Sequence, residues 1–254
     1  MNNVSKKALI GSNVKIGNFT TINDDVIIGD NVEISSCVLI DNGARISNNV
    51  KIGHGSAIAI TPQDLKFEGE ETIFEIGENT IVRECVTLNR GTKQSGKSSV
   101  GKNCLLMAYT HVAHDCIIGD NVILANLVNM GGHVEIDDWA IVGGMVPIHQ
   151  FVRIGMHSLI AAGFRTMKDV PPYIISGNLP MQYEGVNIIG LRRRGFTSEQ
   201  IKKIGDIYHI LYKSGLNISD ALKKIKNEHE MKDEAKVIID FIETSSRGII
   251  GGER

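Results

Sequence analysis

Half of the 8 histidines in the chain lie within a window of 39 residues: His111, His114, His133 and His149. Imidazole titrates near neutral pH and is the commonest general base in enzymes. Asp115 directly follows His114, and a carboxylate beside a histidine can fix its tautomer and stabilise the imidazolium that forms. The cluster therefore predicts proton transfer at a histidine with a carboxylate partner. Two alternatives stay open at this point, a zinc site and a set of unrelated surface histidines.

A repeat of six residues carries these histidines. From Val4 to Ile160 every sixth residue is apolar, and of the 27 positions in this frame only Asp64, Glu70 and Gln94 are not. A period of six fits neither a helix nor a long alternating strand. It fits a short strand and a tight corner, and three such units make a triangular coil of about 18 residues. The repeat thus predicts an all-β parallel β-helix of about nine coils, spaced about 4.8 Å apart.

Coil geometry brings the histidines together. The step from His114 to His133 and the step from His114 to His149 each fall one residue from a whole number of coils. Asp115 lies one full coil below His133. We therefore expect the three histidines to form a column along one corner, within roughly 10 Å of height. Glycines interrupt the same region and should leave backbone N–H groups open to a ligand, namely Gly131, Gly132, Gly143 and Gly144.

The six-residue pattern lapses at 61–75 and 89–99 without losing its phase. We expect loops thrown out from corners of the coil, where functional residues tend to lie. The second lapse contains Gly91-Thr-Lys-Gln-Ser-Gly96-Lys97-Ser98, which matches the phosphate-binding loop of nucleotide hydrolases. That motif acts only ahead of a helix whose N-terminus holds the phosphate. Because the repeat resumes at Val100, we interpret the segment as a flexible polar loop with lysines.

The periodicity becomes helical after the run Val170-Pro171-Pro172-Tyr173. Thr197 to Gln200 matches a capping box, apolar residues follow at helical spacing, and Gly215 fits the end of that helix. Ser219 or Asp220 could begin a second helix, and residues 237–242 indicate a third.

We therefore predict two domains, a β-helix over residues 1–185 and a small α-helical domain over 186–254 that covers the last coil. The run Arg192-Arg193-Arg194 lies just ahead of the first predicted helix. It is either a solvated charge run or a guanidinium cluster that binds phosphates.

Composition limits the function classes. The chain is 42% hydrophobic, yet no stretch approaches 18 consecutive apolar residues, so we expect no membrane span. The start of the chain lacks an apolar signal region, which predicts a cytoplasmic protein. A net charge of −2 offers no basic surface for nucleic acid. Cys37 and Cys85 lack the spacing of a disulfide or metal site, whereas Cys104 and Cys116 fall in the inward row of the coil.

Several motifs now converge with the hexad frame: His111-Val112-Ala113-His114-Asp115-Cys116, Gly132-His133, His149-Gln150-Phe151, Gln63-Asp64-Leu65-Lys66, Asp169-Val170-Pro171-Pro172-Tyr173, and Gly185-Val186-Asn187 through Arg193-Arg194-Gly195-Phe196. Together they resemble the UDP-N-acetylglucosamine acyltransferases of lipid A biosynthesis over nearly the whole chain. The resemblance implies a left-handed coil, against the usual hand of β crossovers. It also implies a homotrimer with active sites between adjacent subunits.

The resemblance further implies roles for individual residues. His114 would be the general base that takes the proton of the sugar 3-hydroxyl, Asp115 its orienting partner, and the backbone N–H of Gly132 the oxyanion donor. Other positions would contact substrate: Asp64, Lys66, His111, His133, His149 and Gln150. Three positions would lie near the nucleotide and phosphopantetheine phosphates: Asn187, Arg193 and Arg194.

The implied reaction is direct transfer of an (R)-3-hydroxyacyl group from acyl carrier protein to UDP-N-acetylglucosamine. The acyl group arrives on the phosphopantetheine of the carrier protein, so no further cofactor and no metal are expected. Two further positions matter for substrate recognition in this family. Ile189 stands where the family commonly carries an acidic residue near the nucleotide. Ala162 matches the position that gauges acyl length, where a small residue predicts a long chain.

The six-residue repeat is also compatible with two other functions. One is a sibling hexapeptide transferase that acylates an amine or uses coenzyme A. The other is a β-helix protein that is not an acyltransferase, either a scaffold or a zinc enzyme similar to the γ-class carbonic anhydrases. In those enzymes we expect the ligands to meet between subunits, with a longer spacing than His111-x-x-His114 offers.

Overall fold

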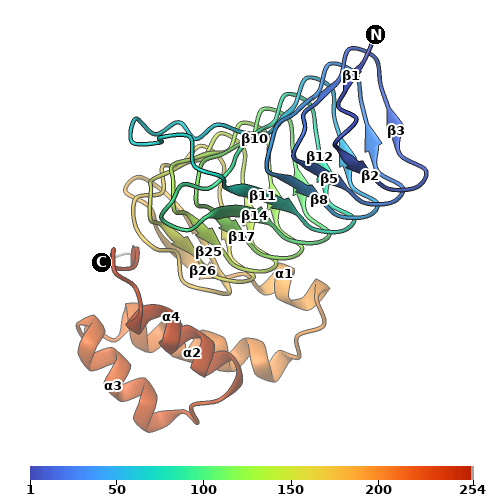
Figure 1. The fold of residues 1–254 in the computed structure, drawn as a ribbon. Coiled ribbons are helices and arrows are strands. Elements are labelled where there is room, and N and C mark those ends of the chain that lie inside the picture. The colour runs from blue at the N-terminus through green and yellow to red at the C-terminus, as the bar shows by residue number, and fades with distance from the viewer. Residues whose placement is uncertain (253–254) are drawn as a thin grey trace.

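The computed structural model describes residues 1–252, and Figure 1 shows a triangular coil of short strands with helices at one end. The strands form three sheets, one for each face of the coil, in which strands of successive turns pair. Asn3 pairs with Thr21 and Val4 with Ile22, so each residue pairs with the one that lies a whole coil further along. The coil is left-handed. The predicted fold, a left-handed parallel β-helix followed by a small helical region, is confirmed.

The first face consists of β1 (Asn3–Val4), β4 (Thr21–Ile22), β7 (Leu39–Ile40), β10 (Ala57–Ile60), β13 (Thr87–Asn89), β16 (His111–Val112), β19 (Asn129–Met130) and β22 (Pro147–Ile148). The second face consists of β2 (Leu9–Ile10), β5 (Val26–Ile28), β8 (Ala44–Ile46), β11 (Ile73–Ile76), β14 (Lys97–Val100), β17 (Ile117–Ile118), β20 (Glu135–Ile136) and β23 (Arg153–Ile154). The third face begins with β3 (Lys15–Ile16), β6 (Glu33–Ile34), β9 (Lys51–Ile52), β12 (Ile81–Val82), β15 (Leu105–Leu106), β18 (Ile123–Leu124), β21 (Ile141–Val142) and β24 (Leu159–Ile160). It continues through β25 (Ile174–Gly177), β26 (Gln182–Val186) and β27 (Gly251–Gly252).

The apolar residues of the six-residue frame fill the coil, since all of them from Ile22 to Ile160 are buried. Each such side chain contributes roughly 1.5–3 kcal/mol relative to leaving it in water. Val4 and Ile10 remain 36% and 37% exposed because the first coil has no neighbour beneath it. The predicted inward positions of Cys104 and Cys116 are confirmed, since both thiols are buried.

Each coil turns at three corners, and at most of these turns a residue adopts the left-handed backbone conformation. We name each corner after one of its residues. The Asp115 corner, between the first and second faces, includes Asp115, His133 and Phe151. The His157 corner, between the second and third faces, includes Asn121, Trp139 and His157. The Leu127 corner, between the third and first faces, includes Tyr109, Leu127 and Met145.

Between the coil and residue 252, the structure contains four helices: α1 (Ile188–Arg193), α2 (Ser198–Lys213), α3 (Ile218–Glu228) and α4 (Asp233–Glu243). The predicted capping box is present, with Thr197 and Gln200 bonded reciprocally. Gly215, with φ +76°, follows the end of α2 as predicted. The second predicted helix begins slightly earlier than expected, at Ile218, because the side chain of Asn217 caps it by accepting from the N–H of Asp220. The short helix α1 was not predicted.

The helices lie at the end of the coil opposite the N-terminus (Figure 1). The buried Tyr208 on α2 donates a hydrogen bond of 2.6 Å to the carbonyl of Pro172, which anchors the helices to the last coil. The predicted boundary between residues 185 and 186 falls within β26, and residues 253–254 of the predicted second domain lie outside the described residues. The division into two domains stays a prediction. Within residues 1–252 no helix has the length and apolar character needed to cross a membrane.

Candidate active site

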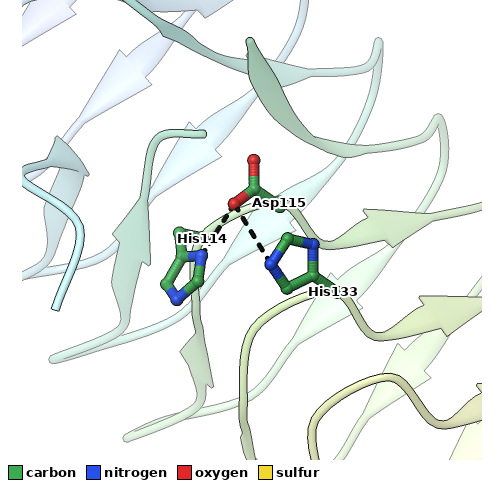
Figure 2. A group of neighbouring side chains, drawn as sticks. All are labelled: His114, Asp115 and His133. Carbon is green, nitrogen blue, oxygen red and sulfur yellow. Dashed lines mark hydrogen bonds and ion pairs between the residues drawn. The ribbon is translucent and has the colours of Figure 1, made fainter. Parts of the chain in front are cut away.

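The Asp115 corner gathers the predicted histidine–carboxylate pair, as Figure 2 shows. His114 Nδ1 lies 2.7 Å from Asp115 Oδ2, and His133 Nε2 lies 3.6 Å from the same oxygen. The rings of His114 and His133 meet edge to face with centroids 5.3 Å apart. His133 also stacks on Phe151, one coil above it, at 4.5 Å. Because Asp115 binds Nδ1 of His114, the other ring nitrogen, Nε2, is left to exchange a proton with a ligand.

Asp115 is held as a carboxylate. Burial raises its pKa, but hydrogen bonds from Ser95, His114 and Thr92 outweigh burial and hold the pKa at about 2. The carboxylate is therefore ionised throughout the neutral range, and only 4% of the residue is exposed. By contrast, burial lowers the pKa of His133, although the negative charge of Asp115 opposes the change. An ionised carboxylate beside His114 favours the imidazolium that proton transfer creates.

Gly132 lies directly against the His114 ring. A Cβ atom built on Gly132 would lie 2.5 Å from Cε1 and 2.7 Å from Nε2 of His114, so only glycine fits beside this imidazole. Among the described residues no acceptor binds the backbone N–H of Gly132. This N–H group is therefore available to a ligand next to the open nitrogen of His114.

Two loops leave the coil at the Asp115 corner, where the sequence pattern lapses. The first, residues 61–72, joins β10 to β11, and the second, residues 90–96, joins β13 to β14. They touch each other, since the Arg90 guanidinium lies over the Phe67 ring at 5.4 Å and Lys93 pairs with Glu68 at 3.4 Å. As predicted, the β-helix resumes after the second loop: a strand, β14, follows it, and not the helix on which a phosphate-binding loop depends.

The first loop carries Asp64 and Lys66 to this corner. Asp64 accepts a hydrogen bond of 3.0 Å from the backbone N–H of Lys66. Asp64 is close enough to His133 that its charge opposes the lowering of the histidine pKa. The Lys66 side chain is exposed. The structure thus brings the predicted Asp64 position to the histidine column.

Other predicted residues surround the column. His111 lies on β16 in front of the corner, and its Nδ1 is 2.7 Å from the hydroxyl of Thr87. Burial lowers the pKa of His111, and the neighbouring His114 lowers it further. His149 and Gln150 lie one coil above Gly131, with His149 Nδ1 3.1 Å from the Gln150 carbonyl.

Asn187 and Arg194 lie at a different corner, next to His157. The Asn187 side chain donates 2.9 Å to the His157 carbonyl and caps α1 by accepting from the N–H of Gly190. Arg194 Nη1 lies 3.2 Å from His157 Nδ1, and its guanidinium lies over the Trp139 ring at 5.3 Å. Burial between these groups, and the charge of Arg194, lower the pKa of His157 to about 4. His157 therefore remains neutral and accepts from Arg194.

The remaining two predicted positions are exposed. Arg193 is the last residue of α1. Ala162 lies at the Leu127 corner, where its backbone nitrogen is 2.6 Å from a Cβ built on Gly143. Within one chain the predicted residues therefore divide among the Asp115, His157 and Leu127 corners.

Sequence reasoning missed Thr92 and Ser95, which donate to Asp115, and Phe151, which stacks on His133. Phe151 could have been found, because it lies one whole coil after His133 in the six-residue frame. Thr92 and Ser95 are separated from Asp115 by 23 and 20 residues, which are not whole coils. Only the conformation of the second loop brings them to the carboxylate.

The donor atoms of His114, Asp115 and His133 lie within 4.8 Å of one another, a spacing that would suit a metal site. The donor set does not fit this use, because the oxygens of Asp115 already accept from Thr92, Ser95 and His114. The buried thiols are equally unsuited to chemistry. Burial raises the pKa of Cys104 to about 11 and that of Cys116 to about 12, so neither forms a thiolate near pH 7.

Two family models match the chain. The model described as "Bacterial transferase hexapeptide (six repeats)" matches residues 7–42 and 97–132. The model described as "Udp N-acetylglucosamine O-acyltransferase; Domain 2" matches residues 169–250. The coil, its histidine–carboxylate corner and the helical end therefore define a hexapeptide-repeat acyltransferase.

Individual relatives are more specific. The acyl-[acyl-carrier-protein]–UDP-N-acetylglucosamine O-acyltransferase of Burkholderia mallei is 42% identical over 203 residues, 78% of each chain. The UDP-N-acetylglucosamine acyltransferase structure from Bacteroides fragilis is 49% identical, with a TM-score of 0.96 over 98% of both chains. That from Francisella novicida is 39% identical, with a TM-score of 0.96 over 100% of this chain and 93% of its own. The chain belongs to the UDP-N-acetylglucosamine O-acyltransferase family.

Proposed function

We propose that this protein transfers an (R)-3-hydroxyacyl group from acyl carrier protein to the 3-hydroxyl of UDP-N-acetylglucosamine, the first step of lipid A biosynthesis. The observation that carries the proposal is the His114–Asp115 pair beside the N–H of Gly132, in a chain of this family. The proposed reaction involves no metal and no covalent acyl-enzyme.

His114 acts as the general base. With Nδ1 donating to Asp115, its Nε2 accepts the proton of the sugar 3-hydroxyl while the oxygen attacks the thioester carbonyl carbon. The carbonyl oxygen becomes an oxyanion, which the N–H of Gly132 stabilises. When the intermediate collapses, the C–S bond breaks and the thiolate of phosphopantetheine takes the proton from His114. The products are the sugar ester and the free thiol of the carrier protein.

The substrates span several corners of the coil. Residues at the Asp115 corner hold the sugar and the thioester in this proposal: Asp64, Lys66, His111, His133, His149 and Gln150. Arg193 and Arg194 bind phosphates, and Asn187 supports them from the same end of the chain. Ile189, 67% exposed, offers an apolar surface where the family commonly carries an acidic residue, so nucleotide contacts there differ from the family pattern.

We further propose that the enzyme is a cytoplasmic homotrimer with active sites between subunits. The predicted residues lie at three corners of one chain, and neighbouring corners are up to about 20 Å apart along a six-residue side. A neighbouring subunit can bring a second corner against the first. Exposed apolar side chains at the Leu127 corner fit such a contact, since Tyr109, Leu127 and Met145 are 58%, 45% and 62% exposed.

The test is an incubation of the purified protein with UDP-N-acetylglucosamine and a panel of 3-hydroxyacyl-acyl carrier proteins. We expect an O-acylated product with at least one donor. Product only with coenzyme A thioesters, or only with an amine acceptor, would assign the protein to the sibling transferases instead. Parallel assays with the 3-amino analogue of the sugar would define the acceptor.

Substitution of Ala162 by Met should shift the preferred donor to a shorter acyl chain. A methyl side chain leaves room at this exposed corner position, and the longer side chain of Met would shorten an acyl groove that passes it. We expect relative kcat/KM for the longest accepted donor to fall about tenfold or more, by analogy with hydrophobic pockets that reject an extra group. An unchanged donor preference would remove Ala162 from the acyl site.

Chelation of divalent metals should leave the activity unchanged. The physical reason is that the acceptor positions of Asp115 are occupied by neighbouring donors and Nδ1 of His114 is occupied by Asp115. The measurement pairs the metal content of the purified protein with its turnover before and after treatment with EDTA. One zinc per chain, together with loss of activity on chelation and its return with zinc, would support a zinc enzyme instead.

A further inference from the structure

The loop of residues 90–96 is built around Asp115 and not around a phosphate. Its base is closed tightly, since a Cβ on Gly91 would lie 2.4 Å from the backbone nitrogen of Lys97. The hydroxyl of Thr72 donates 2.5 Å to the Gly91 carbonyl, and the Gly96 N–H donates 2.8 Å to the Thr92 carbonyl. These contacts fix the loop, and they aim Thr92 and Ser95 at the carboxylate.

Thr92 makes two hydrogen bonds to Asp115. Its N–H donates 2.9 Å to Oδ1 and its hydroxyl donates 2.8 Å to Oδ2. The Ser95 hydroxyl lies within hydrogen-bond distance of both Asp115 Oδ1 and the Lys97 carbonyl. It has a single proton, which goes to the carboxylate because charged acceptors form the stronger bond.

These three donors determine what else Asp115 can bind. A carboxylate offers about four acceptor positions, two on each oxygen. The loop fills both positions of Oδ1 and one of Oδ2, and His114 fills the last at 2.7 Å. His133, at 3.6 Å from Oδ2, is left outside hydrogen-bond distance. Asp115 therefore accepts a hydrogen bond from His114 and none from His133, although both histidines lie beside it (Figure 2).

We propose that Thr92 and Ser95 are positioning residues of the acyl transfer. They keep the Asp115 carboxylate hydrogen-bonded to His114 and not to His133, and they lower the basicity of this carboxylate. The inference rests on the proposed function, in which His114 is the base. Without the Thr92 hydroxyl, one position on Oδ2 opens to His133, and the carboxylate can turn between the two imidazoles. When either hydroxyl is removed, fewer hydrogen bonds compensate the negative charge of the carboxylate. The carboxylate then attracts the His114 imidazolium more strongly.

The test compares four variants: Thr92→Val, Ser95→Ala, Thr92→Ser as the conservative replacement, and Gln94→Ala as the control. Gln94 is an exposed side chain of the same loop that lies outside the proposed site. The acidic limb of kcat/KM against pH reports protonation of the base. We expect this limb to move upward by about half to one pH unit in Thr92→Val and Ser95→Ala, with plateau values about tenfold lower. Thr92→Ser keeps a hydroxyl and should therefore keep the acidic limb and the plateau value of the unchanged protein. Gln94→Ala should also match the unchanged protein in both.

Histidine NMR provides a readout that does not depend on turnover. Titration of 13C-labelled imidazoles should show the His114 pKa raised in Thr92→Val and Ser95→Ala relative to the unchanged protein. Ser95 is exposed, so Ser95→Ala tests the idea even if Thr92→Val folds poorly. An active wild type whose variants keep the same acidic limb and the same His114 titration would overturn the inference. An inactive wild type with shifted titrations would instead refute the proposed function and leave the positioning of the carboxylate supported.

Discussion

Replacement of His114 by Ala should lower kcat/KM for acyl transfer by about three orders of magnitude. General acid–base catalysis by a positioned side chain contributes roughly 10²- to 10⁴-fold, and alanine leaves nothing at the open nitrogen to accept the sugar proton. The effect should exceed the lower end of this range, because the ionised Asp115 stabilises the imidazolium only when His114 is present. The measurement is product formation at pH 7 to 8 with UDP-N-acetylglucosamine and the preferred acyl carrier protein donor.

A matched control is His54→Ala, which removes an exposed imidazole elsewhere on the coil. That variant should retain full activity. Both variants should keep the unfolding temperature of the parent, because neither imidazole is part of the apolar core. Turnover that survives in His114→Ala would mean that another group takes the proton, and His133, at the same carboxylate, would be the next residue to replace.

The coil was predictable because each of its units obeys the same local rule. An apolar residue every six positions fixes the faces, and the pairing of whole coils follows from it. At the His157 corner, asparagine side chains of successive coils hydrogen-bond to one another, and their spacing in the sequence shows how the coil accommodates the two loops. Steps of 18 residues at the start become 30 from Asn49 to Asn79 and 24 from Asn79 to Asn103. Both insertions are multiples of six, so every later side chain keeps its face.

The end of the coil was not predictable in the same way. The antiparallel hairpin of β25 and β26 depends on pairing with β24 and β27, and β27 is contributed by residues far away in the sequence. Helix α1 has only six residues and a glycine at its centre, Gly190. It forms because Asn187 caps it and Leu191 is fully buried, which are tertiary contacts. Short elements that depend on such contacts leave little trace in local periodicity.

At the site, the sequence predicted the histidine column but not the hydrogen bonds that hold Asp115 in place. Asp115 and His133 are related by one whole coil, and His114 directly precedes Asp115, so the proximity of the three residues follows from the repeat. Thr92 and Ser95, the donors from the 90–96 loop, are not related to Asp115 by whole coils, because a loop outside the repeat has no register with the coil. The glycines that match the phosphate-loop pattern, which the sequence analysis set aside, have another role here: Gly91 approaches Lys97 closely, and Gly96 adopts a φ of +75°. They shape a tight loop without making a nucleotide site.

Replacement of Gly132 by Ala should abolish most of the activity while leaving the fold intact. The added Cβ would lie 2.5 Å from Cε1 and 2.7 Å from Nε2 of His114, so the ring has to move. Movement of the imidazole breaks its 2.7 Å bond to Asp115 and withdraws Nε2 from the sugar hydroxyl. A displacement of about 1 Å at a reacting group can cost on the order of 100-fold in rate, and we expect a loss at least that large in kcat. The alanine keeps its backbone N–H, so the loss would report the position of His114 and not the removal of the proposed oxyanion donor.

The control for this substitution is Gly205→Ala on α2, where an added Cβ meets no atom within 4 Å. That variant should keep its activity, and it should gain up to about 1 kcal/mol in stability because alanine favours a helix more than glycine does. Gly132→Ala should keep an unfolding temperature close to that of the parent, because its clash falls on a partly exposed ring that can rotate and not on the core of the coil. Full activity in Gly132→Ala would show that the enzyme does not need the His114 ring where it lies. A large fall in its unfolding temperature would show instead that this glycine serves the coil and not the reaction.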